Sequence, residues 1–272
     1  MLHVHKIASL DLPELEPYRT LRRPDVHRQQ RIFVVDGEKI LRRLLLSRFA
    51  LQSVLLTEEW FSVFESALRK RSEAIAVYLV GKPLLEKLVG FTMFQGVLAV
   101  ARIPELPTLE TILKASVSPG LFVATDGVSN AENLGTLVRN CAAFSVQALL
   151  ISQSSSSPFL RRAVRSSMGG IFQIPVLENL ELAQTLAVLR ENNFRCIAAH
   201  PHSAGKILPE LNLRQNCCLV FGNEAQGISP EVLAACDDCA AVPMPPGVDS
   251  MNVSNAAAVF LYETWRQRAA PR

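Results

Sequence analysis

The chain has 272 residues, of which 49% are hydrophobic and 19% charged, and its formal net charge is +3. This composition is typical of a globular protein and excludes an intrinsically disordered one. The length indicates two domains of ordinary size. No run reaches the ~18 apolar residues that a membrane span requires, and Met1 to Leu12 does not resemble a signal peptide. We therefore expect a soluble cytoplasmic protein.

The positive charge is concentrated in the first part of the chain. Residues 1–108 carry 16 Lys and Arg against 12 Asp and Glu, whereas residues 109–272 carry 12 against 13. Nine of the basic residues lie between Arg19 and Arg48, with three acidic residues among them. Charge alone favours a solvated helical face, but a one-sided basic stripe is also typical of a surface that binds phosphates.

The six cysteines do not indicate a disulfide framework in a chain of this length. Cys217 and Cys218 lie inside an apolar run, as core thiols do. Cys236 and Cys239 form a C-x-x-C pair, which could bind zinc if a second pair joined it. The sequence contains no second C-x-x-C and no His pair at metal-site spacing, so we favour buried cysteines and expect no metal.

The first part of the chain alternates β-like runs with amphipathic stretches. Strands are predicted at residues 32–35, 53–57, 75–80 and 97–101, where β-branched and apolar residues dominate. Helices are predicted at residues 38–48, 58–70 and 83–89 from apolar residues at helical spacing. The two prolines of residues 103–108 break either element, so we expect domains at 1–108 and 109–272.

The second part alternates more regularly. Strands are predicted at residues 121–125, 148–152, 172–176, 196–199, 217–221 and 240–243, and helices at 134–143, 159–168, 180–192, 230–235 and 252–268. Such alternation with continuous apolar strands predicts a parallel sheet covered by helices on both faces. Ligands then bind at the carboxyl ends of strands, here after Thr125, Phe221 and Pro243. The serine-rich residues 152–158 are interpreted as a solvated loop.

Common cofactor and nucleophile motifs are absent from these strand ends. The sequence has no G-x-G-x-x-G for a dinucleotide, no P-loop and no G-x-S-x-G nucleophile turn. Three polar, glycine-containing clusters occupy the expected ligand loops instead.

The first cluster, residues 126–141, follows a predicted strand and reads Asp-Gly-Val-Ser-Asn-Ala-Glu-Asn-Leu-Gly-Thr-Leu-Val-Arg-Asn-Cys. We expect a turn, then Asn133 as the cap of the next helix, with Arg139 in its second turn. Taken singly, the segment is equally compatible with a capped helix that carries a surface arginine.

The second cluster, residues 219–229, runs from a buried strand into a turn. Gly222 and Gly227 allow backbone amides to approach a ligand closely. Glu224 follows an apolar strand, where a carboxylate is costly unless it is paired or hydrogen-bonded. A simple strand-to-helix turn does not require that carboxylate.

The third cluster, residues 242–256, combines prolines with polar residues. The prolines stiffen the loop because each ring fixes its own backbone angle, and Gly247 permits a sharp bend. Ser250, Asn252 and Ser254 precede an apolar helix, and capping that helix accounts for only one of them.

In this order and at these strand ends, the three clusters resemble the motifs of the SpoU (TrmH-like) family of RNA 2′-O-ribose methyltransferases, part of the SPOUT superfamily. The resemblance covers roughly residues 118–270, including the segment 165–170 and the pair Ile174 and Pro175. More loosely, residues 33–39 and 95–99 resemble a substrate-binding domain that often precedes these enzymes and is similar to ribosomal proteins that bind kink-turn RNA. That likeness favours RNA as the partner of the basic stripe.

Two positions depart from the family pattern. Pro246 stands where a glycine is usual, with Gly247 one position later, and Met251 replaces the usual leucine. Neither change removes a polar group with an expected catalytic role.

The resemblance implies an α/β protein whose carboxyl-terminal parallel-sheet domain contains a deep trefoil knot, a rare exception to the rule against knots. A small α/β ribosomal-protein-like RNA-binding domain precedes it. The resemblance also implies S-adenosylmethionine as the cofactor, no metal, and a homodimer whose active sites draw on both subunits. The cofactor-binding residues that it implies are Phe221, Gly222, Gly227, Val242, Met244, Met251 and Asn252.

The same resemblance assigns the chemistry, which is to place a ribose 2′-hydroxyl in line with the methyl group of the cofactor and to help remove its proton. The family assigns that role to the first-motif arginine, here Arg139. Because a guanidinium is almost never deprotonated, we expect Arg139 to orient the hydroxyl and a neighbouring phosphate. The other catalytic residues implied are Asn133, Glu224, Ser250 and Asn252. RNA contacts are expected from Arg22, Arg23, Arg28, Arg31, Arg42, Arg43 and Arg165.

Three alternatives stay open. A non-catalytic RNA-binding ribosome assembly factor is expected to lack Arg139, Glu224 or Asn252, and all three are present. A base methyltransferase is disfavoured by Asn133 with Arg139 and by the string from Ser250 to Asn252. The separate amino-terminal domain favours ribosomal RNA, but this is an analogy at the level of the fold, and a tRNA 2′-O-methyltransferase stays possible.

Overall fold

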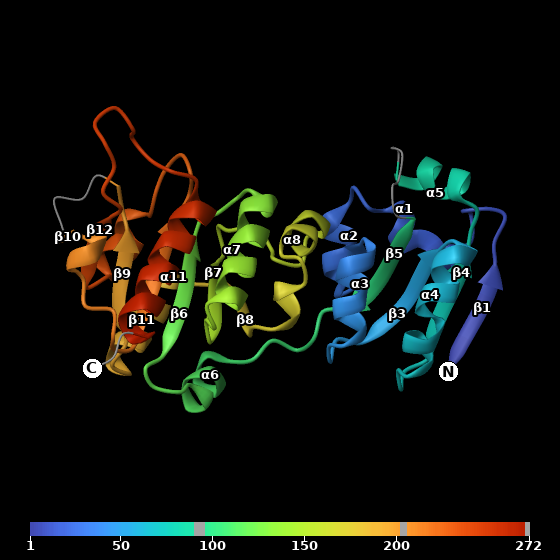
Figure 1. The fold of residues 1–272 in the computed structure, drawn as a ribbon, viewed down its shortest axis with the longest axis horizontal. Helices are drawn as coiled ribbons and strands as arrows, with labels where there is room; N and C mark the ends of the chain where they lie inside the picture. Colours follow the sequence, from blue (N-terminus) through green and yellow to red (C-terminus); the bar gives the residue numbers. More distant parts are fainter. Residues whose placement is uncertain (90–95, 202–205, 270–272) are drawn as a thin grey trace. The chain divides into compact units, whose positions relative to one another are not determined.

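The computed structural model describes residues 1–89, 96–201 and 206–269, and Figure 1 shows their arrangement. The chain forms two compact units. The first comprises Met1–Glu105 with Phe159–Phe172, and the second comprises Leu106–Pro158 with the chain from Gln173 onward. The sequence predicts a boundary after residue 108 and places residues 159–172 in the second domain, whereas in the structure this segment belongs to the first unit.

The first unit is built on a five-stranded sheet in the order β1-β4-β3-β5-β2. β1, β4 and β3 are parallel, and β5 is antiparallel to both β3 and β2. The strands are β1 (Leu2–Lys6), β2 (Ile32–Asp36), β3 (Leu51–Leu56), β4 (Ile75–Leu79) and β5 (Val97–Arg102). Four lie where the sequence predicts strands. β1 was not predicted, because His3, His5 and Lys6 interrupt its apolar pattern and most of its residues are exposed.

Helices cover this sheet with apolar faces set by their sequence periodicity. In α3, the residues Ile40, Leu41, Leu44 and Leu45 are all buried, as their helical spacing predicts. Thr57 caps α4 by accepting a hydrogen bond from the backbone N–H of Trp60. The helices of the unit are α1 (Glu16–Arg19), α2 (Pro24–Gln29), α3 (Glu38–Leu45), α4 (Glu58–Arg69), α5 (Lys82–Val89) and α8 (Arg161–Ser166), with 3₁₀ turns η1 (Pro13–Leu15) and η2 (Gly170–Phe172).

Residues 159–172 join the first unit through aromatic packing. Phe159 and Phe172 lie 5.6 and 6.1 Å from the ring of Phe33, and Phe172 lies 5.2 Å from the ring of Phe49, measured between centroids. Phe33, Phe49 and Phe159 are buried in this cluster and Phe172 is partly buried beside them, so aromatic packing holds the segment in the first unit. No local sequence pattern reveals that preference, so the predicted boundary differs from the observed one.

The second unit is built on a seven-stranded sheet in the order β10-β12-β9-β11-β6-β7-β8, and every neighbouring pair is parallel. The predicted parallel sheet is confirmed. The strands are β6 (Leu121–Asp126), β7 (Ala148–Ser152), β8 (Val176–Leu180), β9 (Arg195–Ala199), β10 (Lys206–Ile207), β11 (Cys217–Gly222) and β12 (Asp238–Ala241). The strand predicted at 172–176 is wrong in position: the strand begins at Val176, because Phe172 ends a 3₁₀ turn in the first unit.

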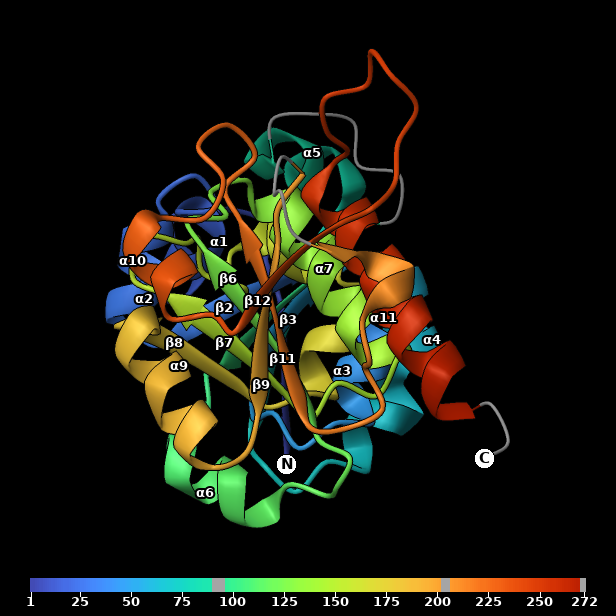
Figure 2. The same ribbon diagram turned by 90° about the vertical axis from the view of Figure 1, so that its left-hand side faces the viewer.

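Helices lie on both faces of this sheet. α7 and α11 pack against each other on one face, with α11 against β11, while α9 lies against β7 and β9 on the other face with α10 beside it; Figure 2 shows the two layers. The bounds are α6 (Leu109–Ala115), α7 (Ala131–Ala143), α9 (Leu182–Glu191), α10 (Pro230–Ala234) and α11 (Val253–Ala269), with the 3₁₀ turn η3 (Leu208–Glu210). Because all strands of this sheet are parallel, the carboxyl ends of β6, β11 and β12 lie at the same edge of the sheet. These ends carry the three polar clusters.

The structure can also be searched for a metal site among the cysteines and for a helix that could span a membrane. Cys236 is partly buried and its thiol donates to the carbonyl of Val232, and burial raises the pKa of that thiol. Across the described ranges, no three His, Cys, Asp or Glu side chains group closely enough to hold a metal ion. No helix within those ranges is both long and apolar enough to span a membrane.

Candidate active site

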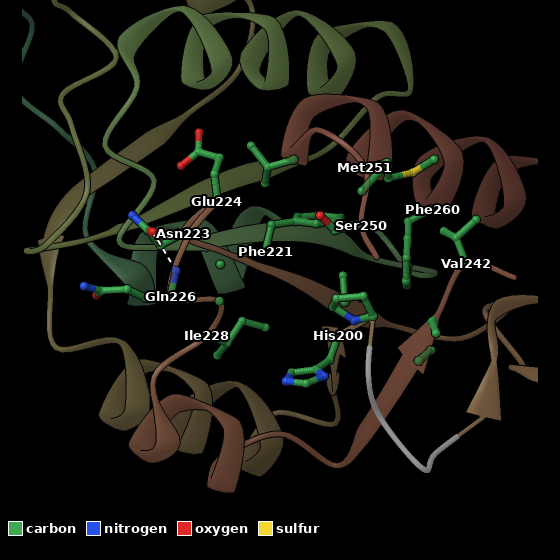
Figure 3. A pocket seen from close by; sticks show the side chains of 18 of the residues that line it. His200, Phe221, Asn223, Glu224, Gln226, Ile228, Val242, Ser250, Met251 and Phe260 are labelled. Atoms are coloured by element: carbon green, nitrogen blue, oxygen red, sulfur yellow. Dashed lines mark hydrogen bonds between the residues drawn. The ribbon is translucent and has the colours of Figure 1, made fainter. Parts of the chain in front are cut away.

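A cavity of about 290 Å³ lies at the carboxyl ends of β9, β11 and β12, and Figure 3 shows the side chains around it. Its walls are mainly apolar, and its polar side chains come from the turn after β11, the loop before α11 and His200 at the end of β9. The volume lies near the lower end of the ~300–1,000 Å³ range of small-molecule sites. The lining residues are Ala199, His200, Pro201, Phe221, Gly222, Asn223, Glu224, Ala225, Gln226, Gly227, Ile228, Ala240, Ala241, Val242, Met244, Ser250, Met251, Val253, Ala256 and Phe260.

The turn after β11 forms one wall and is closed by its own backbone. The N–H groups of Asn223 and Gly227 donate to each other's carbonyls at 2.8 and 2.9 Å. The side-chain oxygen of Asn223 accepts from the N–H groups of Ala225 and Gln226 at 2.8 and 3.0 Å. The turn is therefore rigid before any ligand binds.

The two glycines of this turn serve different purposes. A Cβ at Gly222 would lie 2.3 Å from the carbonyl carbon of Gly227 and 2.4 Å from the amide nitrogen of Ile228, so this position tolerates no side chain. Gly227 has φ +72°, and a Cβ there would point into open space. The close approach that the sequence suggested at Gly222 is thus made to the chain itself, and the open space lies at Gly227.

The loop between β12 and α11 forms the opposite wall. Val242, Met244, Ser250 and Met251 from this loop line the cavity. The backbone of Gly247 has φ +89°, which permits the bend that the sequence predicts. The prolines around it restrict the backbone, so the loop holds apolar side chains against the cavity with few conformations of its own.

Three side chains from the three clusters form one hydrogen-bonded chain. Asn133 donates from Nδ2 to Oε1 of Glu224 at 2.5 Å, and Asn252 donates from Nδ2 to Oδ1 of Asn133 at 3.0 Å. Oδ1 of Asn252 accepts from the backbone N–H and the hydroxyl of Ser254 at 2.9 and 2.6 Å, which fixes the start of α11. Asn252 belongs to this polar chain and is not among the cavity-lining residues.

Two details of these residues differ from what the sequence predicts. The cap of α7 is Asn130, whose side chain accepts from the N–H groups of Glu132 and Asn133, so Asn133 lies in the first turn of the helix. An asparagine three residues earlier caps as well, and the pattern alone does not separate the two. Glu224 is exposed, so its carboxylate is hydrogen-bonded without the burial cost that the apolar strand suggested.

Arg139 is not part of the polar chain. It lies in the third turn of α7 rather than the second and its side chain is exposed. Among the interactions of the described residues, none involves the side chain of Arg139. Within one chain, the structure therefore brings together Asn133, Glu224 and Asn252, with Ser250 at the cavity, and leaves Arg139 outside.

Several cavity residues were not predicted from the sequence. His200 and Pro201 follow β9, whose carboxyl end lies beside that of β11, and Ala240 comes from β12. The general rule for parallel sheets points to the end of β9, but no unusual residue pattern marks it. Phe260 lines the cavity from α11 as an ordinary core residue of an apolar helix.

The seven arginines expected to contact RNA lie in the first unit and are all exposed. Five of them have partners. Arg42 forms an ion pair with Glu38 at 2.7 Å and covers the ring of Phe64, Arg43 donates to the carbonyl of Met168, and Arg31 donates to that of Pro104 at 3.0 Å. Arg165 lies 3.6 Å from Asp36. Arg28 also has an interaction. The side chains of Arg22 and Arg23 have none within the described ranges.

Comparison with known proteins identifies the chain. The model of the SpoU rRNA methylase family matches residues 120–262, which contain all three clusters. The chain belongs to this family. An uncharacterised tRNA/rRNA methyltransferase of Mycobacterium tuberculosis (strain H37Rv) is 31% identical over 97% of this chain and 93% of its own. The predicted family resemblance is therefore confirmed.

Solved structures agree with this assignment over nearly the whole chain. The crystal structure of an RNA 2′-O-ribose methyltransferase is 26% identical, with a TM-score of 0.80 over 98% of this chain and all of that one. An AdoMet-bound rRNA methyltransferase from Sinorhizobium meliloti is 20% identical, with a TM-score of 0.83 over 98% of this chain and 99% of that one, and shares the fold. Both units of the chain are thus covered by the fold of these structures.

Proposed function

We propose that this SpoU family protein transfers a methyl group from S-adenosylmethionine to a ribose 2′-hydroxyl of RNA. The observation that carries the proposal is the hydrogen-bonded chain of Glu224, Asn133 and Asn252 beside a preformed cavity. These polar groups come from the first turn of α7, the turn after β11 and the loop before α11, and they meet where a substrate can reach them. The relative that is 26% identical over nearly the full chain is described as an RNA 2′-O-ribose methyltransferase, which supports the ribose as acceptor.

The cavity suits S-adenosylmethionine. Its apolar walls can cover an adenine ring and a methionyl chain, and the backbone groups of a rigid turn can hydrogen-bond to the polar edges. The open space at Gly227 leaves room for a ligand against the backbone. The residues proposed to hold the cofactor are Phe221, Gly222, Gly227, Val242, Met244 and Met251. When bound, the cofactor supplies a methyl group on a sulfonium, and binding requires no metal.

The protein contributes orientation. Glu224 binds Nδ2 of Asn133, and Asn252 binds its Oδ1. The side-chain amide of Asn133 therefore has one orientation next to a bound ribose. Ser250 reaches the cavity from the third cluster and can hydrogen-bond to the ribose. Arg139 orients the 2′-hydroxyl and a neighbouring phosphate, and its guanidinium does not act as the base.

A homodimer would bring Arg139 to the reaction. In α11, which packs against α7, the side chains of Val259, Tyr262 and Trp265 are 37%, 53% and 53% exposed. Large exposed apolar side chains on one helix favour a protein interface. We propose that this surface joins two copies of the chain, so that the exposed Arg139 on the adjacent helix faces the cavity of the partner.

The proposal extends to the knot and to the RNA. The chain runs from β11 to β12 beyond β9, and α11 then returns to β11 and α7; this path supports the deep trefoil knot that the family resemblance implies. The exposed arginines of the first unit, such as Arg22 and Arg23, support RNA binding by that unit. Ribosomal RNA is the favoured substrate and tRNA the alternative, and either places the reaction in the cytoplasm.

The test is methyl transfer with labelled S-adenosylmethionine to ribosomal RNA and to tRNA from cells that lack the protein. Methylation of a 2′-hydroxyl blocks alkaline cleavage of the next phosphodiester, so labelled, alkali-resistant dinucleotides are expected. Asn133→Ala serves as the control, since it breaks the polar chain and should lose transfer. If alkaline hydrolysis releases the label in mononucleotides, the protein is a base methyltransferase. RNA binding without methyl transfer would identify an assembly factor.

A further inference from the structure

The serine tract after β7, residues 152–156, is hydrogen-bonded to the first cluster. It was interpreted from the sequence as a solvated loop. In the structure Ser152 is only 5% exposed and its hydroxyl accepts from the N–H of Gly127 at 3.2 Å. Ser155 accepts from the N–H of Val128 at 3.1 Å and donates to the carbonyl of Thr125 at 3.2 Å. The loop that leads into α7 is therefore held by hydroxyl groups.

Further bonds continue along the same loop. The backbone N–H of Ser156 donates to the carbonyl of Val128 at 2.9 Å, and its hydroxyl donates to the carbonyl of Ser129. The hydroxyls of Ser152 and Ser154 lie 2.9 Å apart, and those of Ser152 and Ser155 lie 3.1 Å apart. The backbone between β6 and α7 is irregular, so its N–H and C=O groups do not pair within a sheet or a helix. Serine hydroxyls can both donate and accept, and they form hydrogen bonds with these groups.

Asp126 extends this network to the turn after β11. The residue is 7% exposed. Its Oδ1 accepts from the hydroxyl of Ser154 at 3.4 Å, and its Oδ2 accepts from the backbone N–H of Ser229 at 2.8 Å. Beside it, Nδ2 of Asn223 donates to the carbonyl of Gly127 at 2.7 Å. One buried carboxylate thus connects the serine tract with the segment that carries Glu224.

We propose that Asp126 and the serine tract form a positioning network for the active site. It fixes the loop before α7 against the turn after β11, so that Asn133 on one side meets Glu224 on the other. The inference rests on the proposed function, because it gives the network a purpose in the same site. None of its residues lines the cavity, so they act through Asn133 and Glu224 and do not contact the cofactor.

Mutations distinguish a positioning network from one that only stabilises the fold. Loss of a purely structural contact lowers the melting temperature and weakens cofactor and RNA binding together. Loss of a positioning contact lowers kcat while the affinity for S-adenosylmethionine and the KM for RNA stay close to those of the wild type. A shift of catalytic groups by a fraction of an ångström to an ångström can reduce the rate by up to ~10²-fold.

The experiment compares Asp126→Ala, Asp126→Asn and Ser155→Ala in the full-length protein. Asp126→Ala removes both contacts of the carboxylate, whereas Asp126→Asn keeps an acceptor for Ser229 and can donate to Ser154. The matched control is Ser116→Ala, which removes a hydroxyl that donates to the carbonyl of Leu113 at 2.8 Å. Ser116 precedes the amino end of β6, whereas the two loops follow the carboxyl ends of β6 and β11. Methyl transfer, calorimetry with S-adenosylmethionine and amide hydrogen exchange are measured for each variant.

We expect kcat to fall by roughly 10- to 100-fold in Asp126→Ala and Ser155→Ala, with unchanged cofactor affinity and with faster exchange at residues 126–133. Asp126→Asn should recover most of the rate, and Ser116→Ala should resemble the wild type. Wild-type kcat in both Ser155→Ala and Asp126→Ala, or a parallel loss of melting temperature, affinity and rate, would overturn the inference. A wild-type protein without methyl transfer would instead refute the proposed function; unchanged exchange at residues 126–133 would then refute the network as well.

Discussion

The tight contact at Gly222 offers a direct test of how the cofactor wall is built. In Gly222→Ala, the new Cβ would lie 2.3 Å from the carbonyl carbon and 2.5 Å from the carbonyl oxygen of Gly227, both of them backbone atoms. Non-bonded carbons rest at about 3.5–4.0 Å, so the turn must move by roughly 1 Å or more. No side-chain rotation can relieve this overlap.

The size of the effect follows from the bonds that close the turn. The two hydrogen bonds between Asn223 and Gly227, at 2.8 and 2.9 Å, cannot both survive such a shift. Each is worth about 1 kcal/mol net, which sums to about 2 kcal/mol. If binding must restore the turn, affinity for S-adenosylmethionine falls about 30-fold. The melting temperature falls by about 4–8 °C for a unit of this size.

Calorimetry with S-adenosylmethionine and thermal denaturation measure the two effects. Gly81→Ala is the matched control, because a Cβ there would meet only Cδ of Pro83, at an ordinary 3.8 Å. The control should bind and melt like the wild type. A Gly222→Ala variant with the same affinity and melting temperature as the wild type would refute both the packing argument and the assignment of this turn to the cofactor.

Three more outcomes are expected. Arg139→Ala should bind S-adenosylmethionine normally but lose methyl transfer, and Arg139→Lys should recover little, since an ammonium cannot reproduce the planar fork; full activity of the lysine variant would reduce Arg139 to a generic positive charge. The double variant Arg22→Glu, Arg23→Glu should weaken RNA binding and flatten its salt dependence in filter-binding assays; these residues suit the test better than Arg42 and Arg43, which have structural partners. Burial lowers the pKa of His27 below its ordinary 6.5, although the carbonyl of Pro17 opposes the shift. The unfolded chain therefore binds the proton more readily, so stability is fully present above pH 6.5 and is lost as the pH falls below it. Melting curves between pH 7.5 and 5.5 should show this decline, and His27→Gln should reduce it.

The three polar clusters contain features that the sequence predicts and others that it does not. Their residue types and their positions after apolar strands could be predicted, because strand periodicity and the rule for parallel sheets are local properties. The cap of α7 was assigned to Asn133 instead of Asn130, since both residues can cap and only backbone geometry distinguishes them. The sequence predicts a solvated loop for the serine tract, because the partners of its hydroxyls lie in the loop after another strand, β6.

The sequence by itself determined the parallel sheet, the family and the identity of the polar residues. Each of these follows from short-range patterns of hydrophobicity or from motifs within about a dozen residues. The tertiary structure decided which groups meet: Asn133 bonds to Glu224 across 91 positions and to Asn252 across 119. It also decided that Phe159 and Phe172 pack with Phe33 in the first unit. Such contacts depend on the burial and geometry of the whole fold, which no local pattern encodes.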